Sequence, residues 1–247
     1  MTDIPTLGLI VPPAHGRVPD DGPRLYAGRV RFLARGLGID HICANGFAPV
    51  IEAIRGHALA LRDDGAHALS LMGTSLSFHR GLAFTEDLCA QMADATGLPC
   101  TTMSHAIVRA LRALGVRRVA VATAYTGALN RDLARFLGET GFETAALDGL
   151  GMTGVLAVAD VGRDALTQLA QRVVQQSAGA DGLLISCGGL RTLDLLVPLQ
   201  AQLGLPVVAS SPAGFWDVMA CAGLDATTPG FGPLFEQPAP VEHARLT

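Results

Sequence analysis

The sequence predicts an α/β protein whose strands form mostly parallel sheets, and three observations carry that prediction. Strand-like apolar runs alternate with helix-like segments along the chain, which is typical of βαβ units. Several runs are continuously apolar, as expected of strands buried on both faces. Two stretches of the chain also resemble each other. With 247 residues, the chain is long enough for one large or two small domains with a sizeable core.

The first half opens on the apolar run Thr6–Val11, which Pro12 and Pro13 end. From Pro12 to Arg35, prolines and charged residues predict a long loop with room for a short helix, and such a loop after a buried strand is more often functional than idle. Apolar spacing and Gly65 predict a helix over 48–64. The following elements are expected to be a strand at 66–72, a helix at 84–95, a strand at 98–102 and a helix at 105–114 capped by Ser104.

The second half repeats this alternation and ends in a tail rich in proline and glycine, which we expect to be a loop from Thr227 onward. Its expected strands lie at 116–122, 144–147, 183–186 and 206–209. Its expected helices lie at 128–139, 164–176, 193–203 and 215–222.

An internal repeat relates the two halves. The segment 65–75 resembles 179–189, and 97–104 resembles 204–211. We therefore expect two parallel-sheet α/β halves related by a pseudo-twofold axis, with the active site in the cleft between them. The expected halves are residues 1–114 plus 210–247, and residues 115–209. In this repeat, Gly73 is the counterpart of Cys187.

Composition excludes several classes of protein. The net charge of −4 gives no basic face for nucleic acid, and no apolar run approaches the roughly 20 residues that a membrane helix needs. The 5 cysteines are scattered and the 7 histidines form no helical ligand pair, so neither a disulfide framework nor a metal site is expected. The N-terminus has no basic, apolar leader, so we expect a cytoplasmic protein.

The chain contains no lysine, so all 18 basic residues are arginine. That absence removes the Schiff-base lysine of pyridoxal enzymes, the lysine that carries biotin and the lysine of a nucleotide-binding P-loop. We expect no cofactor. The spacing Gly149-x-Gly151-x-x-Gly154 formally fits a dinucleotide fingerprint, but no strong strand precedes it and no long helix follows, so we interpret it as a loop.

Cys187 is the first candidate for chemistry. It ends the buried strand that begins near Gly182, and Gly188 and Gly189 follow it. Ligands of open α/β folds bind outside the carboxyl ends of such strands, and glycines let backbone N–H groups approach a ligand closely. The alternative is a buried cysteine that serves only in packing.

Other residues at strand ends supply hydrogen-bond donors. Thr74 and Ser75 follow one predicted strand, and Tyr125 follows another. With the N–H groups of residues 187–189, they would form a neutral nest suited to a carboxylate or an enolate oxyanion. Hydroxyl residues after strands can equally be turn formers and helix caps. Apolar candidates for the same cleft, which could also be core residues, are Ile39, Ile42, Phe47, Leu76, Val155 and Val158.

Several segments together are similar to one family. The chain resembles the arylmalonate decarboxylases of the aspartate/glutamate racemase superfamily over nearly its whole length, except mainly the tail after Thr227. The segments that carry the resemblance are 11–13, 70–78, 97–104, 111–120, 122–125, 186–190 and 210–217.

The resemblance implies a cofactor-free, enantioselective decarboxylation of α-aryl-α-substituted malonates to α-arylcarboxylates through an enediolate. It implies that Cys187 donates the proton and that the apolar candidates above surround the leaving carboxylate. It also implies a dioxyanion hole formed by Thr74, Ser75, Tyr125, Cys187 and Gly188, or its neighbour Gly189. The partner would be a small dicarboxylate, and the protein a monomer or a small homo-oligomer.

Two other function classes remain as alternatives. An amino-acid racemase needs an acid or base on each face of its substrate, and the superfamily's maleate cis–trans isomerases carry two cleft cysteines. Gly73 opposite Cys187 argues against both. A non-catalytic carboxylate-binding protein would need the donor nest but no thiol, so Cys187→Ser would leave its binding intact.

Overall fold

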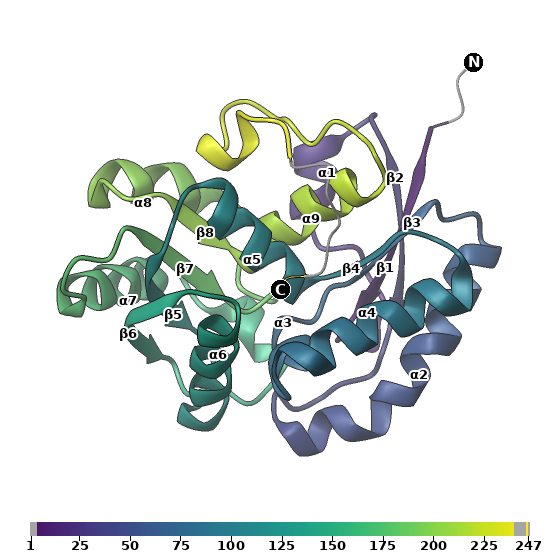
Figure 1. The fold of residues 1–247 in the computed structure, drawn as a ribbon, viewed down its shortest axis with the longest axis horizontal. Helices are drawn as coiled ribbons and strands as arrows, with labels where there is room; N and C mark the ends of the chain where they lie inside the picture. The colour runs from purple at the N-terminus through teal and green to yellow at the C-terminus, as the bar shows by residue number, and fades with distance from the viewer. Residues whose placement is uncertain (1–3, 240–245, 247) are drawn as a thin grey trace.

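Two parallel four-stranded sheets form the centre of the molecule in the computed structural model, which describes residues 4–239 and 246 (Figure 1). The first sheet has the order β2-β1-β3-β4, and the second has the equivalent order β6-β5-β7-β8. The strands of the first are β1 (Thr6–Val11), β2 (Arg31–Gly36), β3 (Ala68–Leu71) and β4 (Cys100–Thr102). Those of the second are β5 (Arg118–Thr123), β6 (Glu143–Gly149), β7 (Gly182–Ser186) and β8 (Val207–Ala209). The predicted parallel α/β architecture is confirmed.

Helices connect the strands and cover the sheets. They are α1 (Asp21–Tyr26), α2 (Ala44–Asp63), α3 (Thr74–Phe78), α4 (Leu82–Thr96), α5 (Met103–Ala113), α6 (Gly127–Glu139), α7 (Arg163–Gln176), α8 (Leu196–Leu203) and α9 (Ser210–Cys221). Short 3₁₀ turns lie at Ala157–Asp160, Leu193–Leu195 and Pro233–Phe235. No helix in the described residues is both long and apolar enough to cross a bilayer.

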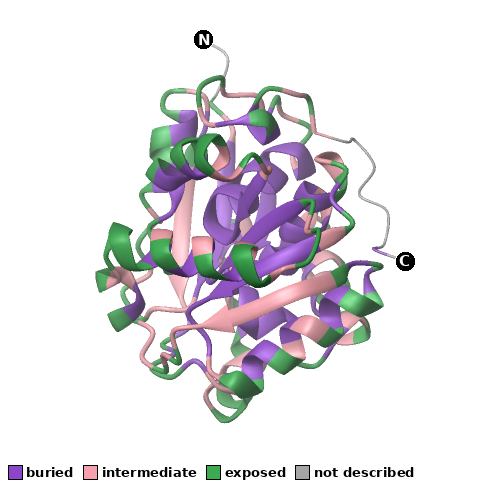
Figure 2. Cartoon of the chain, turned by 90° about the vertical axis from the view of Figure 1, so that its left-hand side faces the viewer, coloured by how far each residue is buried: buried purple, intermediate pink, exposed green. Residues whose placement is uncertain are grey.

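Burial differs from strand to strand, and among the edge strands β8 is fully buried while β2 and β6 are not. The strands β1, β3 and β7 are buried along their whole length, whereas the edge strands β2 and β6 are mostly half-buried, as the purple and pink strands of Figure 2 show. This distribution explains the sequence pattern. A strand covered on both faces must be apolar throughout, and an edge strand need not be.

The structure corrects four expected elements. The segment expected as a loop up to Arg35 contains the edge strand β2, whose arginines at both ends hide its strand character. The break expected at 73–75 leads directly into helix α3, and α9 begins at Ser210, five residues before its expected start. The cap of α5 is Thr102, whose Oγ1 accepts the His105 N–H at 3.2 Å; the expected cap, Ser104, lies inside the helix.

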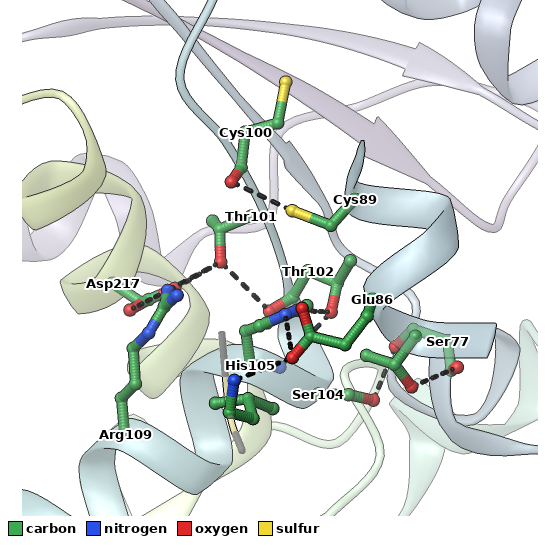
Figure 3. A network of polar contacts seen from close by, with 12 residues as sticks. Ser77, Glu86, Cys89, Cys100, Thr101, Thr102, Ser104, His105, Arg109 and Asp217 are labelled. Carbon is green, nitrogen blue, oxygen red and sulfur yellow. Dashed lines mark hydrogen bonds and ion pairs between the residues drawn. The ribbon is translucent and has the colours of Figure 1, made fainter. Parts of the chain in front are cut away.

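Helices α5 and α9 lie between the sheets and pack on each other. Both contact β4 of the first sheet and β8 of the second. The Arg109 guanidinium on α5 donates to both carboxylate oxygens of Asp217 on α9 at 3.1 Å, and the Thr101 hydroxyl donates to the same carboxylate (Figure 3). These contacts hold the middle of α9 against α5 and β4, and α9 also contacts β7.

Candidate active site

A cavity of about 350 Å³ opens where the carboxyl ends of β1, β3, β5 and β7 meet. Its volume lies in the usual range of small-molecule sites. Most of the predicted site residues line it: Ile39, Ile42, Phe47, Gly73, Thr74, Ser75, Leu76, Tyr125, Val155, Cys187, Gly188 and Gly189. Val158 does not line it. It is buried behind Gly189, where a Cβ added to that glycine would lie 3.2 Å from Val158 Cγ1.

Cys187 follows the last residue of β7 and has an unusual backbone angle. Its φ is +149°, and no other non-glycine residue in the described part of the chain has a positive φ. Its N–H donates to Ser210 Oγ at 3.3 Å, so this group, expected in the dioxyanion hole, is engaged by the protein itself. Residues held at such angles cluster at functional sites.

The Cys187 thiol is protonated at neutral pH. Burial raises the pKa of the thiol to about 11, although hydrogen bonds from the Gly189 N–H, the Tyr125 hydroxyl and the Leu190 N–H stabilise the thiolate in part. The side chain can therefore act as an acid, and the same three donors can hold the thiolate that remains after proton transfer.

Tyr125 joins the predicted donors to the thiol. Its ring is buried edge-to-face against Phe78, with centroids 5.7 Å apart, and its hydroxyl lies 3.3 Å from Ser186 Oγ. Burial raises the pKa of this phenol well above its usual value and the neighbouring Cys187 raises it further, while hydrogen bonds with Ser186, Thr74 and Ser75 act in the opposite direction. The phenol is therefore a neutral donor beside these three hydroxyl groups and the sulfur.

Thr74 and Ser75 are the first two residues of α3, and a buried serine pair fixes this turn. Ser77 Oγ contacts the Gly73 and Thr74 carbonyl oxygens, each at 3.0 Å, and Ser104 Oγ lies 2.6 Å from Ser77 Oγ (Figure 3). Ser104 also donates to the Thr74 carbonyl at 3.1 Å. Ser104 thus positions the donor turn instead of capping its own helix.

The apolar wall is assembled from loops of the two sheets. Ile39 and Ile42 lie between β2 and α2, and Val155 lies after β6. The Ile42 N–H donates to the Thr153 carbonyl at 2.7 Å, and the Val155 N–H donates to the Asp40 carbonyl at 3.0 Å. This backbone pairing also explains the glycine-rich stretch: it is a loop from residue 150 to 154, as predicted, but the strand β6 runs directly into it and ends at Gly149.

Sequence reasoning missed part of the cavity. The long loop after β1, expected to be functional, supplies Pro12, Pro13, His15, Arg17, Val18, Pro19, Asp20 and Asp21. Ser211 and Arg191 also line the cavity. The internal repeat carried a signal for Ser211, because it pairs that residue with Ser104.

Comparison with known proteins agrees with this geometry. The family model described as "Arylmalonate decarboxylase" matches residues 7–235. The chain belongs to the arylmalonate decarboxylase family. The arylmalonate decarboxylase of Bordetella bronchiseptica is 51% identical over 234 residues, which cover 94% of this chain and 97% of that protein. The predicted family, and with it a carboxy-lyase activity, is confirmed.

Solved structures of arylmalonate decarboxylase have the same fold. One crystal structure superposes with a TM-score of 0.86 at 51% identity, covering 94% of this chain and 99% of that one. A liganded double mutant, in which one glycine is replaced by cysteine and one cysteine by serine, gives a TM-score of 0.92 at 50% identity. The maleate isomerase of Pseudomonas putida S16 superposes with a TM-score of 0.85 at 21% identity, which shows a shared fold alone.

In this member of the arylmalonate decarboxylase family, the residue equivalent to Cys187 in the other sheet is Gly73, which has no side chain to act as an acid or base. Gly73 lines the cavity at the end of β3, as Cys187 does at the end of β7. Its φ of −124° suits any residue. The described residues include no group of three or more His, Cys, Asp or Glu side chains that could hold a metal ion.

Proposed function

We propose that the enzyme decarboxylates α-aryl-α-substituted malonates to single enantiomers of α-arylcarboxylates without a cofactor, and that Cys187 protonates the enediolate intermediate. The observation that carries the proposal is a single protonated thiol in the cavity, hydrogen-bonded to Tyr125, with Gly73 in the equivalent position of the other sheet. Family membership supports the same activity.

The two carboxylates of the substrate would occupy different surroundings. The one that leaves would lie against the apolar wall of Ile39, Ile42, Leu76 and Val155, with Phe47 beside them. A carboxylate loses hydration there while CO₂ loses little, so removal of water favours cleavage of the C–C bond. Val158 would act behind this wall by supporting Gly189.

The retained carboxylate becomes an enediolate and gathers the negative charge. Donors fixed before the reaction stabilise such charge without reorganising, and the hydroxyl groups of Ser75 and Tyr125 are placed as donors. The Thr74 hydroxyl donates to Met103 Sδ at 2.7 Å, so it would have to turn toward the enediolate to act as a third donor. The Gly188 N–H makes no hydrogen bond in the described structure. By contrast, the Gly189 N–H donates to the Cys187 sulfur, and the Cys187 N–H donates to Ser210 Oγ. We therefore assign the backbone donor of the dioxyanion hole to Gly188.

Proton transfer then completes the reaction. The S–H bond of Cys187 breaks, its proton forms the new C–H bond at the α-carbon, and the electron pair stays on sulfur. A proton from water restores the thiol. Because Gly73 carries no acid, protonation would occur on one face only, which accounts for a single enantiomer and argues against racemisation by two bases.

We also propose that the enzyme works in the cytoplasm, as a monomer or a small homo-oligomer, on a small dicarboxylate. All five cysteines are free, as suits a reducing compartment. The large hydrophobic side chains exposed in the described residues are Ile4, Leu156 and Val197 only, so the visible surface carries no extended apolar patch.

The test is CO₂ release from methyl(phenyl)malonate with a chelator present and no cofactor added, followed by chiral chromatography. We expect release of one enantiomer and no measurable product from Cys187→Ala. Cys89→Ala is the matched control, because Cys89 is a half-buried thiol that does not line the cavity. Substantial turnover by Cys187→Ala would contradict the proton-donor role.

A further inference from the structure

One polar part of the cavity wall takes no part in the proposed chemistry. Asp21, the first residue of α1, and Ser211, near the start of α9, both line the cavity, and their exposed fractions are 9% and 2%. Ser211 Oγ is buried and has no hydrogen-bond partner in the described structure. No backbone N–H in the described part of the chain donates to the Asp21 carboxyl, and the nearby Arg24 is paired with Asp194 at 2.6 Å.

The Ser211 hydroxyl carries an energetic cost as long as it lacks a hydrogen-bond partner. Buried polar groups are nearly always hydrogen-bonded, and one that is not calls for an explanation. Burial raises the pKa of the Asp21 carboxyl; the Ser211 hydroxyl and Arg24 act against that shift, and the charges of Asp20 and Asp194 add to it. A ligand group that bonds both side chains would remove the cost.

The position of the pair relative to the reaction centre limits what that group can be. Helices α1 and α9 pack on each other (Figure 1), and Ser210, next to Ser211, accepts the Cys187 N–H at 3.3 Å. The polar wall thus adjoins the backbone of the proton donor. The apolar wall comes from other segments, the loops after β2 and β6.

The proposed function already places both substrate carboxylates, one in the donor nest and one against the apolar wall. The part of the substrate that remains for Asp21 and Ser211 is the aryl group. A carboxylate or carboxylic acid accepts a hydrogen bond in either protonation state, and a serine hydroxyl both donates and accepts. A hydroxyl group on the substrate is therefore a partner that the two side chains can bond together.

We infer that Asp21 and Ser211 form a specificity subsite for a hydrogen-bond-donating substituent, above all a phenolic hydroxyl, on the aryl group of the substrate. The inference rests on the proposed function. It predicts that the enzyme selects hydroxyphenylmalonates over phenylmalonate. A site built to bond a hydroxyl discriminates strongly against an analogue without it, because its buried polar groups are then left unpaired.

The experiment compares kcat/KM for 3- and 4-hydroxyphenylmalonate with kcat/KM for phenylmalonate. We expect the wild-type enzyme to favour at least one hydroxylated substrate by about tenfold or more. Ser211→Ala and Asp21→Ala should each reduce this ratio about tenfold, since each removes one partner of the hydroxyl. Asp64→Ala, at an exposed carboxylate that pairs with Arg35 outside the cavity, should leave the ratio unchanged.

A second measurement separates this inference from the proposed function. Calorimetric titration with hydroxyphenylacetate and phenylacetate reports binding without turnover, and circular dichroism verifies that each variant is folded. If no malonate is decarboxylated but Ser211→Ala still loses the binding preference for the hydroxyl, the proposed function fails and the subsite stands. If the wild type turns over phenylmalonate with no preference for either hydroxylated substrate, or the variants keep that preference, the subsite is wrong.

Discussion

Cys187 is held in a backbone conformation that a side chain rarely adopts. A φ of +149° at a non-glycine residue stores strain, of order 1–3 kcal/mol for such regions. The hydrogen bond from its N–H to Ser210 and the parallel pairing of β7 with β5 and β8 maintain this conformation. In return, the sulfur lies among the N–H groups of Gly189 and Leu190 and the Tyr125 hydroxyl. The local structure therefore fixes where the Cys187 sulfur lies and does not make the thiol more reactive.

The raised pKa makes Cys187 a slow nucleophile. Burial moves the pKa of the thiol upward to about 11, so the thiolate fraction at pH 8 is about 0.1% and rises about tenfold with each pH unit. We expect alkylation of Cys187 by iodoacetamide, followed by peptide mass spectrometry, to accelerate about tenfold per unit between pH 8 and pH 10. Rapid labelling that levels off near pH 7 would show that the thiolate is the resting form.

The Tyr125 hydroxyl provides a second test at this scale. Tyr125→Phe removes one donor from the proposed dioxyanion hole, and the loss of one such donor lowers kcat by about 10²–10³. Steady-state kinetics with phenylmalonate measures the change. The matched control is Tyr26→Phe, because that hydroxyl is also buried but donates to the Ala226 carbonyl at 2.9 Å, outside the cavity. Equal losses in the two variants would mean that Tyr125 acts through stability alone.

At the scale of elements, the ends of helices place the groups of the site. Helix α3 presents Thr74 and Ser75, and α9 presents Ser210 beside the Cys187 N–H. Both helices begin immediately after or close to a strand end, so small shifts of either would move the donors relative to the thiol. The Arg109–Asp217 pair connects α9 to α5, and Ser104 on α5 holds the first turn of α3.

This ion pair should be important for stability because it is buried. The Asp217 side chain is 1% exposed and that of Arg109 is 12% exposed. Arg109→Leu would leave a buried carboxylate without its cation, which costs about 3–5 kcal/mol. Urea unfolding measures the loss. Arg118→Leu is the control: its partner Glu143 is exposed, and such surface pairs contribute about 0–1 kcal/mol. Similar losses in both variants would contradict the structural role.

At the scale of the molecule, the two sheets repeat one plan. Each has the same strand order, and each places a candidate position after its third strand in space, Gly73 after β3 and Cys187 after β7. The two positions differ in what they carry: a thiol at one and only a hydrogen at the other. The asymmetry of the proposed reaction therefore arises from one residue in an otherwise repeated architecture.

Gly73→Cys tests this idea. A Cβ at residue 73 would lie 3.2 Å from Leu76 Cβ and 3.4 Å from Pro12 Cγ, so a shift of a few tenths of an ångström accommodates it. With an acid or base on each face, the variant should exchange the α-proton of α-aryl acids and racemise them. Chiral chromatography of an enantiopure acid after incubation measures this. Gly138→Cys, on α6 where a Cβ meets nothing within 4 Å, is the control. Full retention of enantiopurity in Gly73→Cys would refute the opposed placement.

The class of fold, the repeat and the chemical groups at the strand ends can all be predicted from the order of the residues alone. Continuous apolar runs mark strands that are buried on both faces, so β1, β3 and β7 were predictable, and the position after β7 identified Cys187. The edge strand β2 was not, because a half-exposed strand needs no apolar run. Ser104 was mistaken for a cap because its partner, the Thr74 carbonyl, lies 30 residues earlier in the chain.

Which hydrogen-bonding groups are free to contact a ligand depends on how the chain folds in three dimensions. The Cys187 N–H is engaged by Ser210, Val158 lies behind Gly189, and Asp21 meets Ser211 across the packing of α1 on α9. Local pattern reports the propensity of a segment and the burial of its faces. It carries no information on contacts between residues far apart in the chain. In this protein, those contacts determine which hydrogen-bond donors are used within the protein and which remain free to bind substrate.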